Sequence, residues 1–177
     1  GVIINNDQQK NLAVTCDIVF DCSGFGGVIA KKLNLRKENR LKRMAVFGHY
    51  KTNVLNEDVA KGWFVGQMLF NGWIWLIPLK KDFISIGVVI PLEKYQEAKL
   101  SPQKFLENYI RHTPVSKAGI EPNFQLQGKV HLYGNLGYTT SKAYGDGWVL
   151  VGDAAFFIDP CYSSGVHLAL STAKEAA

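Results

Sequence analysis

A stretch near the end of the sequence combines residue types that suit a ligand carrying both hydroxyl groups and negative charge. The apolar run Trp148 to Val151 leads into Gly152-Asp153, and Ser163-Ser164-Gly165 follows shortly afterwards. Four apolar residues bounded by glycine predict a buried strand, and either serine is suited to cap a helix behind it. A carboxylate accepts hydrogen bonds from hydroxyls, and the first N–H groups of a helix attract anions. We therefore expect a polyol and anion site here; the alternative is an ordinary turn and an ordinary helix cap.

A second turn of similar composition lies near the start of the sequence. Ile18-Val19-Phe20 predicts a strand, and Asp21-Cys22-Ser23-Gly24 predicts a turn of small residues after it. A strand that ends in a glycine turn often approaches a nucleotide, because glycine lets the backbone come close to a ligand. A plain strand-to-helix turn is the alternative.

The middle of the sequence predicts an antiparallel meander. Three strands are expected at 63–70, 73–79 and 83–90, with a tight turn at Asn71-Gly72 between the first two. The period of two places Trp73 and Trp75 on one face and Ile74 and Leu76 on the other. Two indoles on one face line either a core or the wall of a ligand site.

Two of these strings resemble known motifs. Trp73-Ile74-Trp75-Leu76-Ile77-Pro78 matches WxWxIP, the signature of flavin-dependent halogenases, at every fixed position. Gly152-Asp153-Ala154-Ala155, with Ile158-Asp159-Pro160 and the segment 163–167, resembles the second flavin motif of FAD-dependent monooxygenases. The chain therefore resembles a flavin-dependent halogenase. The resemblance implies an α/β fold of the p-hydroxybenzoate hydroxylase type, here incomplete. Residues 1–45 and 136–177 would belong to the FAD-binding domain, and 46–135 to an inserted antiparallel substrate sheet.

The resemblance also implies roles for individual residues. Trp73, Trp75 and Pro78 would separate the flavin from the substrate. Backbone N–H groups of Ser164 and Gly165 would bind the halide. The residues implied in FAD binding are Ser23, Gly24, Gly152, Asp153, Pro160, Ser163 and Gly165.

The implied reaction uses FAD in its reduced form, supplied by a separate flavin reductase, together with oxygen and chloride or bromide. A flavin hydroperoxide would oxidise the halide to hypohalous acid, which would halogenate an electron-rich aromatic. Tyr162 stands where tryptophan halogenases have Glu, and Ser164 where they have Thr. This departure favours a phenol or pyrrole, either a small molecule or bound to a carrier protein, over free tryptophan. The alternatives are an FAD-dependent aromatic hydroxylase and an inactive, truncated flavin-binding module.

The family's GxGxxG motif and its active-site lysine would both precede this sequence. We therefore expect a fragment that is inactive when isolated.

Composition narrows the class of protein further. The net charge is +5, but the basic residues are scattered except for a cluster at 31–43, so nucleic-acid binding is not expected. We expect the backbone of this cluster to be irregular. The three cysteines form no CxxC pair and the four histidines are far apart, so we expect reduced thiols, a cytoplasmic protein and no metal site. No uncharged apolar run approaches the ~20 residues that span a membrane. Helix is expected over 92–112, with a break near Leu100, and a strand over 124–133.

Overall fold

The computed structural model describes residues 1–177 except 6, 8–9, 53–58, 60, 81 and 114–123, and at 38–41 and 135 it describes the backbone alone. By its contacts the chain divides into two compact units. One consists of Gly1–Asn39 together with Gly137–Ala177, and the other is the inserted segment Arg40–Leu136. The assignment of an FAD domain and a substrate domain, with boundaries after 45 and 135, stays a prediction.

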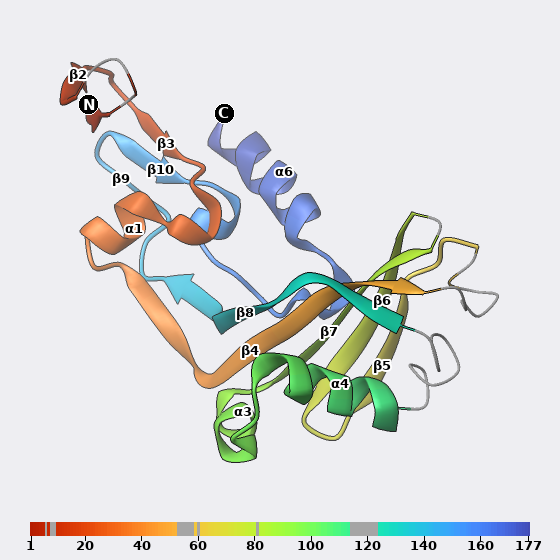
Figure 1. Ribbon diagram of the computed structural model, residues 1–177. Helices are drawn as coiled ribbons and strands as arrows, with labels where there is room; N and C mark the ends of the chain where they lie inside the picture. The colour runs from red at the N-terminus through yellow and green to blue at the C-terminus, as the bar shows by residue number, and fades with distance from the viewer. Residues whose placement is uncertain (6, 8–9, 53–58, 60, 81, 114–123) are drawn as a thin grey trace. The chain divides into compact units, whose positions relative to one another are not determined.

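The inserted unit is built on a five-stranded sheet with the order β5-β6-β7-β4-β8 (Figure 1). The pairs β5–β6 and β6–β7 are antiparallel, as the meander pattern predicts, and β4 also pairs antiparallel with β7. The strands are β4 (Arg36–Thr52), β5 (Val65–Leu69), β6 (Gly72–Lys80), β7 (Phe83–Pro91) and β8 (Phe124–Thr140).

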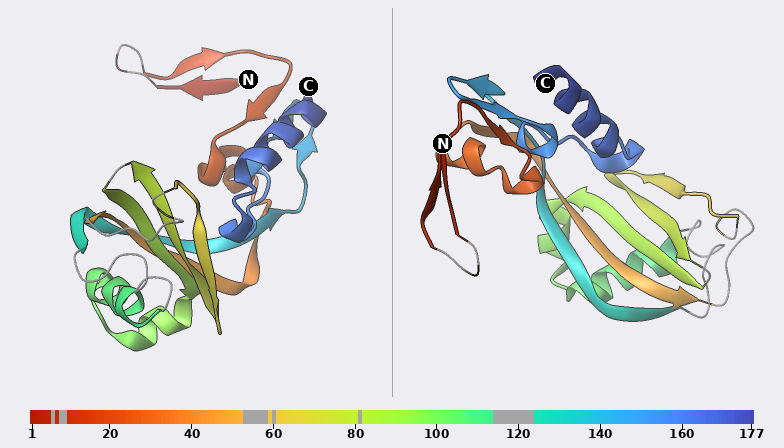
Figure 2. Two further views of the ribbon diagram at one scale, coloured as in Figure 1. Left: turned by 90° about the vertical axis from the view of Figure 1, so that its right-hand side faces the viewer. Right: turned by 90° about the horizontal axis from the view of Figure 1, so that it is seen from above.

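One face of this sheet is covered by two helices, α3 (Leu92–Ala98) and α4 (Pro102–His112) (Figure 2). Helix α4 starts after Ser101, which caps it: the Ser101 hydroxyl accepts a hydrogen bond from the Lys104 N–H, and Pro102 occupies the first helical turn. The predicted break near Leu100 is therefore confirmed. The core between sheet and helices contains fully buried side chains from both layers, among them Val46, Ile74, Leu76, Ile86, Leu106 and Ile110.

The tight turn of the first hairpin lies one residue earlier than the sequence predicts. Leu69 pairs with Gly72, so the turn consists of Phe70 and Asn71. Gly72 belongs to β6 because the neighbouring strand approaches it closely: a Cβ there would lie 1.9 Å from the Val89 carbonyl oxygen. Its glycine is thus required by strand packing and not by the turn.

The unit formed by the two ends of the chain contains a small sheet of order β3-β10-β9. β3 (Val19–Asp21) runs parallel to β10 (Trp148–Leu150), and β9 (Tyr144–Gly145) is antiparallel to β10. A separate hairpin pairs β1 (Val2–Ile4) with β2 (Leu12–Val14). Helices α1 (Val28–Lys32) and α6 (Gly165–Ala176) and the short 3₁₀ turns η1 (Gly24–Gly26), η2 (Gly152–Ala154) and η3 (Pro160–Tyr162) complete the unit.

The basic cluster at 31–43 is not irregular, so that prediction was wrong. Its first two residues end α1, and Arg36 begins the 17-residue strand β4. A polar segment of this kind has no apolar alternation to mark it as a strand. Its place between β7 and β8 in the sheet supplies the pairing that the local pattern does not indicate. The predicted strand from Phe124 likewise continues beyond Tyr133, to Thr140.

Candidate functional site

The structure brings the two predicted ligand-binding turns together. β3 and β10 are parallel neighbours, with Val19 opposite Trp148 and Asp21 opposite Leu150. The turn η1 follows the first strand, η2 follows the second, and the two turns are in contact. Ligands of α/β sheets bind beyond the carboxyl ends of parallel strands. The arrangement therefore suits a nucleotide-type ligand.

A buried carboxylate shapes the first turn. Asp21 is 5% exposed and accepts hydrogen bonds from the Ser23 N–H (3.0 Å), the Ser23 hydroxyl and the Ile29 N–H (2.7 Å). Burial acts to raise the pKa of Asp21, but the bond from the Ser23 hydroxyl and the two backbone bonds outweigh it, so the pKa is lowered. The Ser23 hydroxyl also accepts from the Val28 N–H at 3.0 Å. The predicted ligand residue Ser23 is thus part of the internal network that ties β3 to α1.

The second turn is held in place by the helix behind it. Gly152 has a φ of +57°, and its N–H donates to the Thr172 hydroxyl at 2.8 Å. A Cβ at Gly152 would lie 3.1 Å from the Ala169 Cβ, so both the backbone angle and the packing favour glycine. Asp153 follows, half buried, and burial raises its pKa. Among the residues that the structure describes, none donates a hydrogen bond to its carboxylate, so this group retains its capacity to accept from ligand hydroxyls.

The backbone at Asp153 is fixed by a residue whose role the sequence does not reveal. The Tyr138 hydroxyl donates to the Asp153 carbonyl oxygen at 2.5 Å, and the tyrosine is only 4% exposed. Above its ring lies the Arg36 guanidinium, 3.4 Å from the ring centroid, and the Phe25 ring meets it edge-on at 5.6 Å. Burial raises the pKa of Tyr138 and Asp153 adds to this, while Arg36 opposes it. Tyr138 therefore acts as a buried support for η2.

The start of α6 differs in detail from the prediction. Ser164 occupies the position before the helix, but its side chain accepts no capping hydrogen bond, because its backbone is already helical at φ −77° and ψ −6°. The Leu168 N–H donates to the Ser164 carbonyl, so the N–H groups of 165–167 precede the first bond of the helical ladder. Before it, Asp159 accepts from the Cys161 N–H, and Ser163 takes a left-handed φ of +52°. Tyr162, between them, is 91% exposed.

The tryptophan pair lies on the sheet of the inserted unit, on the face opposite the core. The rings of Trp73 and Trp75 are 5.3 Å apart, whereas Ile74 and Leu76 are fully buried on the core side. This alternation confirms the predicted faces. The Trp75 indole N–H donates to the Ser85 hydroxyl at 3.2 Å, which fixes the ring on the neighbouring strand.

Pro78 does not share that face. It pairs with the core residue Ile84, and the regular β6–β7 register shifts directly after it. Proline has no N–H to donate to a ladder, which accounts for the irregularity. Of the three residues predicted to separate flavin and substrate, Trp73 and Trp75 share this face and Pro78 lies on the other.

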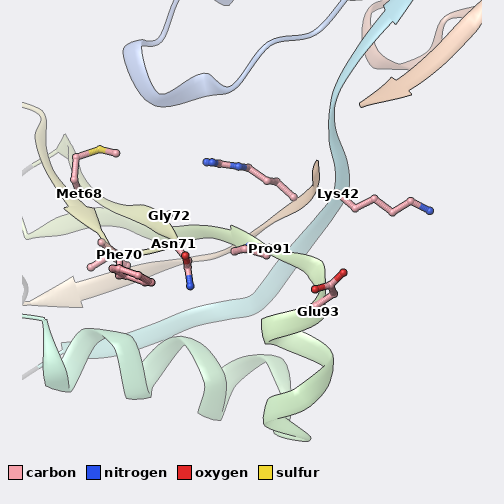
Figure 3. Close-up of a pocket in the computed structure, with 9 residues that line it drawn as sticks. Lys42, Met68, Phe70, Asn71, Gly72, Pro91 and Glu93 are labelled. Carbon is pink, nitrogen blue, oxygen red and sulfur yellow. The ribbon is translucent and has the colours of Figure 1, made fainter. Parts of the chain in front are cut away.

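A surface hollow of about 370 Å³ lies elsewhere on the inserted unit, between the β5–β6 hairpin, the end of β7 and the start of α3 (Figure 3). Exposed Met68 and Phe70 line it together with Lys42 and Glu93. None of the predicted site residues contributes to it.

The described residues contain no group of three or more side chains placed to hold a metal ion. None of the cysteines Cys16, Cys22 and Cys161 is part of a disulfide bond in the described structure. None of the helices in the described ranges has the length and apolar character needed to cross a membrane.

Two glycine turns follow parallel strands, and an antiparallel sheet is inserted between them in the sequence; solved structures of flavin-dependent halogenases share this fold, which is consistent with an α/β FAD-binding fold. Comparison with known proteins gives the family. The family model for tryptophan halogenase matches residues 2–176, and the chain belongs to this family of flavin-dependent halogenases.

Three known proteins illustrate the similarity. Tryptophan 2-halogenase of Chondromyces crocatus is 31% identical over 166 residues, which covers 91% of this chain and 32% of that protein. The 1H-pyrrole-2-carbonyl-[peptidyl-carrier protein] chlorinase of Pseudomonas fluorescens is 27% identical and covers 99% of this chain and 41% of its own length. The crystal structure of the flavin-dependent halogenase CmlS superimposes with a TM-score of 0.82 at 30% identity, covering 96% of this chain and 31% of that one. The chain spans about a third of the length of the curated relatives it matches.

Proposed function

We propose that the complete protein is a halogenase that depends on reduced FAD and oxygen and halogenates an electron-rich aromatic. The observation that carries this proposal is the tryptophan pair. Trp73 and Trp75 carry the WxWxIP pattern and lie on the sheet face opposite the main core cluster, where Trp73 is buried and Trp75 is half-buried. A wall of two indoles on this face is suited to keep an aromatic substrate apart from the cofactor.

The residues present fit FAD at the turn η2. The half-buried Asp153 carboxylate has no donor among the described residues, so it is available to the hydroxyls of a ribityl chain. Gly24, at φ +61°, has open space where its side chain would be, so a ligand can approach that backbone. When bound in its reduced form, FAD supplies the electrons that activate oxygen for oxidation of a halide. We assign FAD contacts to Ser23, Gly24, Gly152, Asp153, Pro160, Ser163 and Gly165.

We place chloride or bromide at the start of α6. The N–H groups of Ser164 and Gly165 would donate to the halide, and the positive end of a 12-residue helix favours an anion there. Hydrogen bonds of this kind orient the halide and partly replace its water.

We propose a phenol or pyrrole as the substrate class, either free or bound to a carrier protein. Tyr162 in place of a Glu supports this class, and the carrier-bound pyrrole named for one relative shows that the family includes such chemistry. A separate flavin reductase would supply the reduced cofactor.

The experiment is mass spectrometry of products formed by the complete protein with reduced FAD, oxygen, bromide and a panel of phenols and carrier-bound pyrroles. A product with the near-equal isotope pair of bromine supports the proposal and identifies the substrate class. Addition of oxygen without bromine would instead assign an aromatic hydroxylase.

We further propose that the 177-residue chain alone is inactive, because it provides only part of an FAD site. Fluorescence titration of the isolated chain should give an FAD dissociation constant weaker than about 1 μM, which corresponds to about −8 kcal/mol. Tighter binding would show that the turns described above are sufficient for the cofactor.

A further inference from the structure

The sheet face that carries the tryptophan pair also gathers two of the four histidines. Strand register places Phe47 opposite Gly87, and Gly87 opposite Trp75. In the next row on the same face, His49 lies opposite Ser85. Ring contacts bring His131 of β8 to this group. We call Phe47, His49, Trp75, Phe83, His131 and Tyr133 the imidazole face.

The rings of the imidazole face form one continuous layer. The Phe47 ring stacks on His131, with centroids 5.2 Å apart and planes at 21°, and on Tyr133 at 5.9 Å and 25°. Phe47 also lies 5.9 Å from Trp75. The His49 ring is 6.4 Å from His131 and 5.8 Å from Phe83. An aromatic ligand placed against these side chains would contact other aromatic rings next to two imidazoles.

The two imidazoles keep their hydrogen-bonding capacity. Both are half buried, and within the part of the chain that the structure describes neither ring nitrogen makes a hydrogen bond. By contrast, the exposed His112 on α4 contacts the Asn108 carbonyl through Nδ1 at 2.7 Å. A neutral imidazole has one nitrogen that accepts and one that donates, so each face histidine is able to accept one hydrogen bond from a ligand.

We propose that the imidazole face binds a flat aromatic compound with an acidic hydroxyl group, and that His49 and His131 select that hydroxyl as hydrogen-bond acceptors. The ligand ring would pack against the aromatic side chains around Phe47 and Trp75. The Lys80 ammonium, 5.2 Å from the Phe83 centroid, adds positive charge at one edge, which favours an oxygen that carries partial negative charge. The identity of the ligand rests on the proposed function. The inference assigns recognition of the phenol hydroxyl to two side chains, His49 and His131.

The first test needs no substitution. The complete protein is treated with diethyl pyrocarbonate, which modifies accessible imidazoles, in the presence and absence of 2-naphthol, and each histidine is quantified by peptide mass spectrometry. We expect 2-naphthol to protect His49 and His131 and to leave His112 and His167 unchanged. 2-Methoxynaphthalene has the same rings without the donor and should protect less. Equal modification of all four histidines with and without 2-naphthol would overturn the proposal.

The second test separates hydrogen bonding from ring packing. His49→Phe and His131→Phe keep a ring at each position, and His112→Phe is the matched control on α4. Calorimetric titration should show about three- to tenfold weaker binding of 2-naphthol to either face variant, the range expected for one neutral hydrogen bond, with 2-methoxynaphthalene binding unchanged. An equal loss for both compounds, or for neither, would contradict the assigned role. Unfolding curves establish that each variant is folded.

These outcomes are independent of the halogenase assay. Bromination of 2-naphthol that is insensitive to both face variants would leave the proposed function standing and remove this inference. Conversely, hydroxyl-dependent binding that is lost in the variants, without any bromination by the wild type, would support the phenol site and count against the halogenase proposal.

Discussion

Gly87 is the position at which the tryptophan wall can be displaced by a single carbon atom. A Cβ there would lie 2.2 Å from Trp75 Cζ2, 2.4 Å from its Cη2 and 2.5 Å from the Phe47 Cβ. These distances are too short to be accommodated without movement. Because β4 holds Phe47 in register, the Gly87→Ala substitution should push the Trp75 indole off β7 and break its hydrogen bond to Ser85.

Overpacking of this kind costs about 1–3 kcal/mol, and loss of the neutral hydrogen bond contributes about 1 kcal/mol of that range. The matched control is Gly134→Ala, because Gly134 has open space around its Cβ position and lies in β8. The control should be neutral or more stable by up to about 1 kcal/mol, since alanine restricts the unfolded chain.

Urea unfolding of both variants gives the free-energy differences, and the Trp75 indole N–H resonance reports the hydrogen bond directly. In the halogenation assay, Gly87→Ala should lower the yield of brominated product relative to Gly134→Ala. If Gly87→Ala unfolds with the same midpoint as Gly134→Ala and leaves the indole resonance unshifted, the steric reasoning is refuted.

Three further predictions concern the unit formed by the two chain ends. Tyr138→Phe should cost about 1 kcal/mol in urea unfolding and weaken FAD binding, because it removes the bond to the Asp153 carbonyl, whereas Tyr162→Phe at an exposed site should change neither. The pKa of Asp21 is lowered, so its stabilising contribution is present above the unfolded pKa of about 3.9 and is lost as the pH falls through the folded pKa. The Asp21→Asn substitution should therefore reduce the loss of unfolding free energy in acid. An unchanged pH profile of that free energy would exclude this role. Ser164→Pro removes one backbone N–H at a φ that proline can adopt, so it should raise the bromide concentration that gives the half-maximal rate. Ser164→Ala keeps the N–H and should not change that concentration. Equal bromide dependence in the two variants would rule out this halide site.

The sequence predicts those features of the fold that depend on local pattern. Alternation around Trp73–Leu76 assigns the two faces of β6, and the pair Ser101-Pro102 marks the start of α4. The glycine turns after β3 and β10 are also evident, because small residues directly follow apolar runs. Features that depend on neighbouring strands are missed. Arg36 to Lys42 has no strand pattern of its own, and Gly72 is required by the approach of Val89.

The same distinction applies to the candidate site. Its motifs can be recognised in the sequence, but the side chains that position these motifs cannot. Nothing local indicates that the Tyr138 hydroxyl reaches the backbone of Asp153, because the two residues meet only after the chain has turned through β9 and β10. His49 and His131 are also distant in sequence, and sheet order alone brings their rings together. From the sequence alone the histidines therefore look isolated.

The pairing of β3 with β10 has a consequence for how the protein is made. During synthesis the strand Val19–Asp21 leaves the ribosome long before its partner Trp148–Leu150 exists, whereas every strand of the inserted sheet is present by the time β10 emerges. Closing a long loop carries an entropic cost, and prior folding of the intervening sheet shortens the flexible loop that must be closed. We therefore expect prior folding of the inserted unit to favour formation of the turns beside Asp21 and Asp153. Variants that unfold the inserted sheet should delay the pairing of β3 with β10, even when the residues of these two strands are unchanged.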